Sequence, residues 1–256
     1  MELKGQTLFS GALHGRRTYY IALPKGLVEG KRYPVIYLLH GYFGSELDWW
    51  HQGQAPLTAQ AMMDKSELEE AIIVIPNDGG YHQGTFYLDW YDGSGNFEQY
   101  FIHDLLPHID ENYPTDPKRR VIAGLSMGGF GAFLLALRNP ELFKAAASMS
   151  GVLRPFSQWN QDMCHRYVGP RQGKYAREHD LNFLVDKRFR EGKLPALYFD
   201  CGRGDELLTD NLGFKDHLDK IGCSYQWQEF AGVHTWEYWR KHLRDVLLFF
   251  NQAFRA

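Results

Sequence analysis

The sequence predicts an α/β fold with a mostly parallel central sheet, helices on both faces and an antiparallel hairpin at the N-terminus. Short apolar segments alternate with longer amphipathic segments from about residue 33 onward, which is typical of strands joined by helical crossovers. Most of the short segments are continuously hydrophobic, as expected for strands covered on both faces. The length of 256 residues fits one domain spanning residues 1–256.

An N-terminal hairpin is predicted by residues 6–10 and 18–23, which flank Gly11 and Gly15. Glycine accommodates the backbone of a tight turn between antiparallel strands. The remaining strands are predicted at short apolar runs, which are residues 35–39, 71–75, 121–123, 145–147, 197–199 and 225–230.

Helices are predicted between these strands. One has an apolar residue at every fourth position, at Phe97, Phe101, Leu105 and Ile109, and Pro107 should kink or restart it. A second is expected at residues 129–137. The last helix should lie against the sheet, because apolar residues recur at spacings of three and four at Trp236, Trp239, Leu243, Val246, Leu247 and Phe250.

Residues 152–194 interrupt this alternation. The segment is long for a crossover and carries nine Lys or Arg against five Asp or Glu. Long insertions in compact α/β domains either cover a functional site or form irregular surface. We therefore treat residues 152–194 as a candidate lid within the single domain.

Composition and charge exclude several classes of protein. Hydrophobic residues make up 44% and charged residues 23% of the chain, which are ordinary values for a globular protein. A net charge of -3 provides no basic field for a phosphate backbone, so nucleic acid is not an expected partner. No segment approaches the roughly 18 apolar residues of a membrane span, so a membrane association is not expected either.

The cysteines predict a reducing compartment. Cys164, Cys201 and Cys223 are odd in number and form no C-x-x-C pair, so neither a disulfide framework nor a zinc knuckle is expected. Residues 1–6 lack the apolar core of a signal peptide. These features predict a cytoplasmic protein, whereas a leader removed before the given chain begins would indicate secretion. No pattern specifies an oligomeric state.

The sequence Gly-Leu-Ser-Met-Gly at residues 124–128 matches the pattern G-x-S-x-G. Its context makes the match specific, because the predicted strand 121–123 leads into it and the predicted helix 129–137 follows. A serine at such a turn is held in strained backbone geometry with its hydroxyl exposed, and the glycines prevent a clash between strand and helix. Ser126 is therefore the candidate nucleophile. A glycine-rich turn with only a packing role is the alternative.

A serine nucleophile needs a base, and the base needs an acidic partner. Among the eleven histidines, His234 alone joins the last predicted strand to the last helix, at the sheet edge where Ser126 lies. Asp205 follows the predicted strand 197–199 and completes the chain order Ser, Asp, His. Asp200, at the end of that strand, is the alternative acid.

The oxyanion that forms during acyl transfer needs two hydrogen-bond donors. One is expected to be the backbone N–H of Met127, the residue after the nucleophile. The other should come from the pattern H-G-x-x-G at residues 40–44, where glycine lets the backbone turn toward a substrate. The Tyr42 N–H is the first candidate and the Phe43 N–H the second.

Aromatic residues are frequent in the loops at the expected active edge. They predict an apolar pocket that accommodates a ring, and they are Tyr42, Phe43, Trp49, Trp50, Phe86, Tyr87, Trp90, Tyr91, Trp159 and Trp236. A small-molecule ester is the expected ligand. No metal or organic cofactor is expected, because the nucleophile comes from the protein itself.

These motifs resemble the putative-esterase branch of the α/β-hydrolases, which includes feruloyl esterases, tributyrin-type esterases, enterochelin esterases and S-formylglutathione hydrolases. The resemblance covers nearly the whole chain and rests on residues 38–49, 100–113, 123–131, 201–207 and 232–239. It implies an α/β-hydrolase fold and a catalytic triad at Ser126, Asp205 and His234. It also implies a serine carboxylesterase that forms an acyl-enzyme with short-chain or aromatic esters, including feruloyl and cinnamoyl esters.

Two alternatives remain open at this point. Phe-Tyr-Leu-Asp at residues 86–89 resembles part of the G-F-Y-x-D stretch of S-formylglutathione hydrolases, and the basic residues of 152–194 would suit the carboxylates of glutathione. The surroundings of His234, with Trp236 and Trp239, are more similar to feruloyl and short-chain carboxylesterases, so we rank carboxylesterase first. A non-catalytic binding protein with the α/β-hydrolase fold is the alternative from another class.

Overall fold

The computed structural model describes residues 1–80, 84–154 and 159–255. An eight-stranded sheet runs through these residues in the order β1-β2-β4-β3-β5-β6-β7-β8. Neighbours from β4 to β8 pair in parallel, whereas β1 with β2 and β2 with β4 are antiparallel. This confirms the predicted mostly parallel sheet with an N-terminal hairpin. The strands are β1 (Glu2–Ser10), β2 (Gly15–Leu23), β3 (Tyr33–Leu39), β4 (Ile72–Pro76), β5 (Thr115–Leu125), β6 (Ala145–Met149), β7 (Ala196–Gly202) and β8 (Gln226–Phe230).

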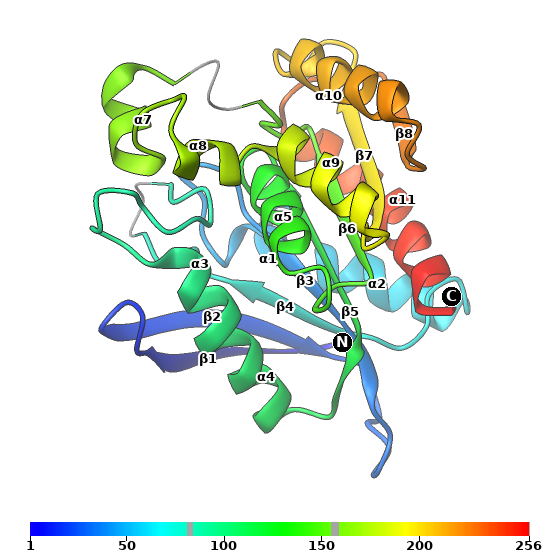
Figure 1. The fold of residues 1–256 in the computed structure, drawn as a ribbon. Helices are drawn as coiled ribbons and strands as arrows, with labels where there is room; N and C mark the ends of the chain where they lie inside the picture. Colours follow the sequence, from blue (N-terminus) through cyan, green and yellow to red (C-terminus); the bar gives the residue numbers. More distant parts are fainter. Residues whose placement is uncertain (81–83, 155–158, 256) are drawn as a thin grey trace.

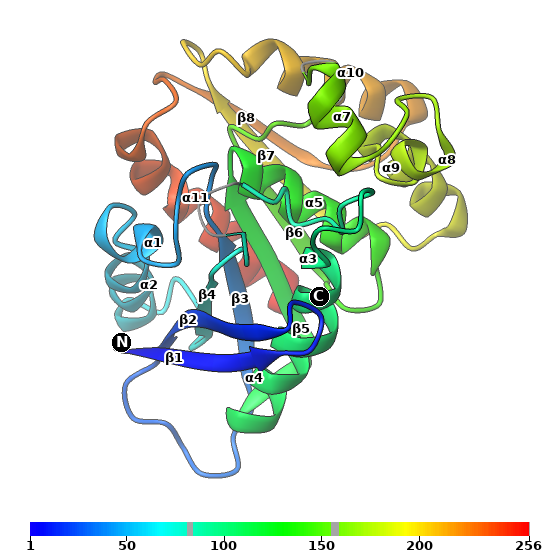
Figure 2. The same ribbon diagram turned by 90° about the vertical axis from the view of Figure 1, so that its left-hand side faces the viewer.

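Helices cover both faces of the sheet (Figures 1 and 2). The helices α5 (Met127–Arg138), α9 (Leu181–Glu191) and α10 (Leu208–Ile221) lie on one face, and α2 (Ala55–Asp64) and α11 (Trp236–Arg255) lie on the other. Strand residues alternate between the two cores. On β3, Val35 and Tyr37 join the cluster that contains α5, whereas Ile36 and Leu38 join the cluster that contains α11. Because successive side chains of a strand point to opposite faces, a fully apolar strand packs against the helices on both sides of the sheet.

The strand β5 begins six residues earlier than the apolar run 121–123 indicates. Its first half contains Pro117, Lys118 and Arg119, and these residues are partly or fully exposed. The pairing with β3 shifts register in this half, between Tyr33 and Val35. A strand that is only half covered needs no continuous hydrophobic run, so the apolar pattern detects its buried half alone.

The helical segment from residue 97 to residue 112 is continuous rather than broken. It consists of α3 (Phe97–Gln99), a π-helical stretch (Tyr100–Leu105) and α4 (Leu106–Asn112). Pro107 occupies the first turn of α4, where a missing N–H costs little. The helix therefore does not break at Pro107. Its winding changes from π-helical to α-helical just before the proline.

The segment 152–194 contains α7 (Gln161–Tyr167), α8 (Lys174–Glu178) and α9, while its residues 155–158 lie outside the described part. α9 is an ordinary crossover helix that packs beside α5 (Figure 1). Arg188 donates to the carbonyl oxygens of Leu137 and Arg138 at the C-terminus of α5, a favourable place for a cation. At least one of the basic residues in this segment therefore has a structural role.

A short helix, α1 (Asp48–His51), follows β3 and packs beside α2. The three cysteines are buried and unpaired. Across the described ranges, no helix combines the length and the apolar character needed to cross a membrane.

Candidate active site

Ser126 occupies a tight turn between the end of β5 and the start of α5. Its backbone has φ 53° and ψ -120°, a strained conformation for a residue other than glycine. A Cβ atom at Gly124 would lie 2.1 Å from the Gly128 carbonyl oxygen, and one at Gly128 would lie 2.5 Å from the carbonyl oxygen of Leu39. Both glycines of the G-x-S-x-G pattern are therefore required by close backbone approach.

Backbone strain is concentrated around this turn. The nearby residues with positive φ are Phe43 at 60°, Phe86 at 54°, Tyr87 at 56° and Ser150 at 47°. The Phe86 N–H donates to the Met127 sulfur at 3.4 Å, which links the loop after β4 to the start of α5. Strained backbone of this kind persists where the surrounding contacts over-determine it, and it is frequent at functional sites.

His234 lies in the loop between β8 and α11, and its imidazole contacts the carboxylate of Asp205. Its Nδ1 lies 2.9 Å from Oδ2 and 3.2 Å from Oδ1 of Asp205. Because a carboxylate only accepts hydrogen bonds, Nδ1 carries the proton and Nε2 presents a lone pair. The ring of Trp239 meets the imidazole edge to face, with centroids 4.8 Å apart. The histidine is thus oriented by an acid and by an aromatic wall.

Asp205 is buried in the loop between β7 and α10. It also accepts the Leu207 N–H at 2.9 Å. Burial alone raises the pKa of Asp205, but the hydrogen bonds from His234 and from the Leu207 N–H outweigh it and hold the pKa below the ordinary value. Asp200 lies elsewhere in the network, where it accepts the hydroxyl of Tyr238 at 2.8 Å. The structure therefore brings Asp205 rather than Asp200 to His234.

The loops that carry Asp205 and His234 are joined through their backbones. The Arg203 N–H donates to the Phe230 carbonyl at 2.8 Å, and the Gly204 N–H donates to the Gly232 carbonyl at 2.9 Å. A Cβ atom at Gly202 would lie 2.5 Å from that same Gly232 oxygen. Glycine at this position lets the two loops approach closely enough for the acid to reach the imidazole.

Ser126 and His234 line one cavity of about 560 Å³. The hydrogen bonds of the described residues do not join Ser126 Oγ to His234 Nε2, although such contacts are often long until a substrate is bound. The remaining lining residues are Gly41, Tyr42, Gly44, Asp48, Gln52, Leu125, Thr235, Trp236, Glu237 and Trp239. The site thus contains an alcohol, an oriented imidazole and a space for a ligand between β3, β5 and α11.

Two backbone N–H groups beside this cavity are available as donors. Among the described residues, neither the Tyr42 N–H nor the Met127 N–H donates to a protein acceptor. Met127 is the first residue of α5, where the N–H groups of a helix are unpaired and its dipole favours negative charge. Of the two candidates for the other donor, Tyr42 lines the cavity, whereas Phe43 is exposed and, like Met127, is not among the lining residues.

Most of the loop aromatics do not line this cavity, so that part of the predicted ring-accommodating pocket is wrong. Of the ten, Tyr42 and Trp236 line it. Phe86, Trp90 and Trp159 are buried and pack around Tyr167 instead, with ring centroids 4.9–5.5 Å from that of Tyr167. Large rings bury much apolar area when they contact one another. Trp239, which the helical pattern places against the sheet, lines the cavity as well.

The candidate lid 152–194 contributes no described residue to the lining of this cavity.

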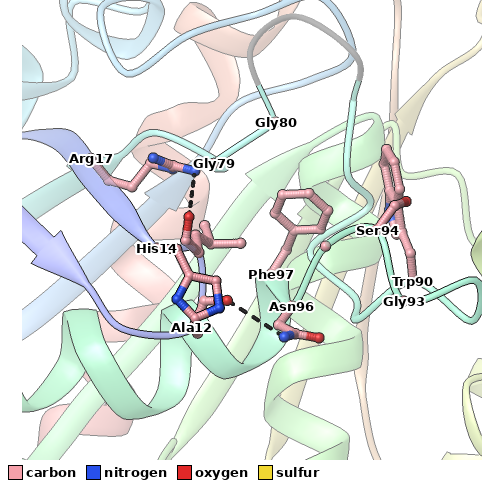
Figure 3. A pocket seen from close by; sticks show the side chains of 12 residues that line it. Ala12, His14, Arg17, Gly79, Gly80, Trp90, Gly93, Ser94, Asn96 and Phe97 are labelled. Carbon is pink, nitrogen blue, oxygen red and sulfur yellow. Dashed lines mark hydrogen bonds between the residues drawn. The ribbon is translucent and has the colours of Figure 1, made fainter.

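A second cavity, of about 360 Å³, lies between the hairpin turn of β1 and β2 and the loops at residues 79–80 and 90–97 (Figure 3). Asn96 donates to the Ala12 carbonyl there, and Arg17 donates to the Leu13 carbonyl. The predicted catalytic and oxyanion-hole residues do not line this second cavity, although Trp90, one of the loop aromatics expected at the substrate pocket, does. Within the described ranges, no group of three or more His, Cys, Asp or Glu is placed to hold a metal ion.

Comparisons with known proteins identify the family of this chain. A protein-family model described as "Putative esterase" matches residues 10–250. An acetyl esterase of Caldicellulosiruptor saccharolyticus is 26% identical over 235 residues, which cover 86% of this chain and 84% of that protein. The S-formylglutathione hydrolase of Bos taurus is 32% identical over 220 residues, with coverage of 78% and 74%.

Among solved structures, a ferulic acid esterase superposes with a TM-score of 0.86 at 31% identity, covering 99% of this chain and 98% of that chain. The family resemblance predicted from the motifs is therefore confirmed. The chain therefore has the α/β-hydrolase fold, belongs to the "Putative esterase" family and is an enzyme that hydrolyses carboxylic esters.

Proposed function

We propose that this esterase works through a triad of Ser126, His234 and Asp205. The observation that carries the proposal is the 2.9 Å contact between His234 Nδ1 and Asp205, which leaves the Nε2 lone pair for a cavity that Ser126 also lines. Nε2 accepts the proton of Ser126 Oγ as that oxygen attacks the ester carbonyl. Asp205 stabilises the imidazolium that results, and its lowered pKa keeps it ionised.

The Tyr42 and Met127 N–H groups hold the oxyanion of the tetrahedral intermediate. Its collapse transfers the proton from Nε2 to the departing alcohol and leaves the acyl group on Ser126. Water then attacks the acyl-enzyme while His234 accepts its proton; the bond between the acyl carbon and Ser126 Oγ breaks, His234 returns the proton to Oγ, and the acid is released. Each proton taken up by His234 is returned within the same half-reaction.

We assign neutral short-chain or aromatic esters, such as acetyl or feruloyl esters, as the substrate class. The described lining of the cavity contains the carboxylates of Asp48 and Glu237 and no Lys or Arg. Like charges repel across a partly desolvated site, so an anionic substrate is disfavoured there. The acetyl esterase and ferulic acid esterase among the similar proteins support this assignment.

Hydrolysis of the thioester S-formylglutathione is the second candidate. The motif at residues 86–89 and the 32% identity to the bovine S-formylglutathione hydrolase favour it. The carboxylates of glutathione would face Asp48 and Glu237 without a counter-ion from the described lining. The ratio of kcat/KM for S-formylglutathione to that for p-nitrophenyl acetate and methyl ferulate decides between the two.

A Ser126→Ala variant tests the triad. It should lose almost all turnover of p-nitrophenyl acetate and all labelling by a fluorophosphonate probe. Ser66→Ala is the matched control, because Ser66 also has positive φ, at 59°, but is exposed and lies outside the cavity. Wild-type turnover in Ser126→Ala would refute the assignment, and a wild-type protein that the probe does not label would favour a binding protein instead.

A further inference from the structure

The peptide group that carries the Tyr42 N–H is fixed through its carbonyl oxygen. This oxygen belongs to Gly41 and accepts two hydrogen bonds, from the Gly44 N–H at 3.1 Å and from His40 Nδ1 at 2.9 Å. In a planar trans peptide the carbonyl and the N–H point in opposite directions. Two donors on the Gly41 oxygen therefore direct the Tyr42 N–H away from them, and it meets no protein acceptor among the described residues.

The imidazole of His40 is held in one tautomer by its two partners. Nδ1 faces a carbonyl oxygen, which only accepts, so Nδ1 carries the proton. Nε2 accepts the backbone N–H of Asp78 at 3.2 Å, so Nε2 presents its lone pair. The residue is 1% exposed. His40 thus connects the loop after β4 to the peptide that carries the Tyr42 N–H.

The neighbouring carbonyl groups are held in the same way. The Leu39 oxygen accepts the indole N–H of Trp49 at 2.9 Å, and the His40 oxygen accepts the hydroxyl of Tyr87 at 3.1 Å. Both donor side chains are fully buried. Three consecutive carbonyl groups therefore each receive a hydrogen bond from a buried side chain, although a loop carbonyl is usually satisfied by backbone or water.

We propose that His40 is a positioning residue that orients the Tyr42 N–H toward the oxyanion. The inference rests on the proposed function, in which this N–H is one of the two oxyanion donors. His40 itself contacts no reacting atom; it acts through the Gly41 oxygen. Tyr87 supports the same loop from the adjacent carbonyl, which gives the motif at residues 86–89 a structural role that does not depend on a glutathione substrate.

Two substitutions separate the two hydrogen bonds of His40. His40→Asn places an amide N–H near the position of Nδ1 and keeps the bond to the Gly41 oxygen, whereas His40→Gln places its amide near Nε2 and loses that bond. Removal of an oxyanion donor typically lowers kcat by about 10²–10³-fold, so its misorientation should cost about 10–100-fold. We expect this loss of kcat in His40→Gln, with little change in KM, and near wild-type kcat in His40→Asn.

The affinity for phenylboronic acid is a second measurement, and a purely structural role of His40 would leave it unchanged. The tetrahedral adduct of this acid with a catalytic serine mimics the oxyanion, so its inhibition constant should rise in His40→Gln by about the same factor as kcat falls. His179→Gln is the matched control. His179 is 2% exposed and its Nδ1 also lies against a backbone oxygen, that of Tyr175 at 2.7 Å, but it is remote from the cavity lining. It should lower the melting temperature and leave kcat unchanged.

The outcomes separate this inference from the proposed function. Turnover in Ser126→Ala would overturn the proposed function itself. An inactive Ser126→Ala together with wild-type kcat and boronate affinity in His40→Gln would overturn only the role of His40. A larger loss in His40→Asn than in His40→Gln would also overturn it. If His40→Gln does not fold, His40→Asn decides: kcat and boronate affinity within threefold of wild type support the role, and any greater loss contradicts it.

Discussion

Asp200→Asn should change how the stability of this esterase depends on pH. Asp200 is fully buried at the end of β7, and its Oδ1 accepts the hydroxyl of Tyr238. Burial raises the pKa of Asp200 from its ordinary value of 3.8 to about 7. The folded state therefore binds this proton more tightly than the unfolded state. Stability from this group is fully present below pH 3.8 and is lost progressively as the pH rises toward 7.

The size of the effect follows from the shift. A difference of about three pKa units corresponds to roughly 4 kcal/mol over the whole titration. Between pH 5 and pH 8 the free energy of unfolding should fall by roughly 2–3 kcal/mol through this group alone. Asparagine is neutral at both pH values and keeps an acceptor for Tyr238. Its extra buried N–H donors carry a cost that does not depend on pH.

Urea unfolding of wild type and Asp200→Asn at pH 5, 6, 7 and 8 measures this difference. The stability of the variant relative to wild type should increase steadily with pH, because the other titrating groups contribute almost equally to both proteins. The nearby carboxylates of Asp245 and Asp205 add to the effect of burial, because their negative charges also raise the pKa of Asp200. A difference between the two proteins that stays constant within about 0.5 kcal/mol would refute the reasoning.

Three further changes test the site. Asp205→Asn should lower kcat about 10⁴-fold in ester turnover, because an amide permits the wrong tautomer of His234. Gly128→Ala should lower the melting temperature strongly and abolish activity, because its Cβ would lie 2.5 Å from the Leu39 oxygen; an unchanged melting temperature would contradict the elbow geometry. Glu237→Gln should raise kcat/KM for S-formylglutathione about two- to fivefold relative to kcat/KM for p-nitrophenyl acetate. The same ratio in wild type and variant would show that the charge of Glu237 does not select substrates.

The position of Ser126 was predictable because sterics dictate the motif. The two glycines at positions 124 and 128 are required because a Cβ atom there would lie 2.1 and 2.5 Å from backbone oxygens. The choice of acid was not decided in this way. Asp200 lies near the end of β7 and Asp205 in the loop after it, and the contacts between that loop and the loop of His234, including the close approach of Gly202 to the Gly232 oxygen, bring Asp205 to His234.

The surroundings of the site were harder to predict. A loop aromatic has the same sequence signature whether it lines a cavity or packs on other rings, as Phe86 and Trp159 do. The hydrogen bonds of His40 depend on carbonyl directions that no spacing encodes, although its place in the H-G-x-x-G pattern was a usable signal. The exposed half of β5 was missed because hydrophobicity identifies only buried strand residues.

The distance between acid and base is set mainly by backbone contacts. The Gly204 N–H to Gly232 oxygen bond joins the loops that carry Asp205 and His234, and Tyr238 restrains the same place. A Cβ atom at Gly232 would lie 2.4 Å from the Tyr238 ring, whose hydroxyl bonds Asp200 on β7. Because the sheet, the acid loop and the start of α11 are connected in this way, little reorganisation is needed when charge develops on the imidazole. Preorganisation of this kind is where much of the rate enhancement of an esterase originates.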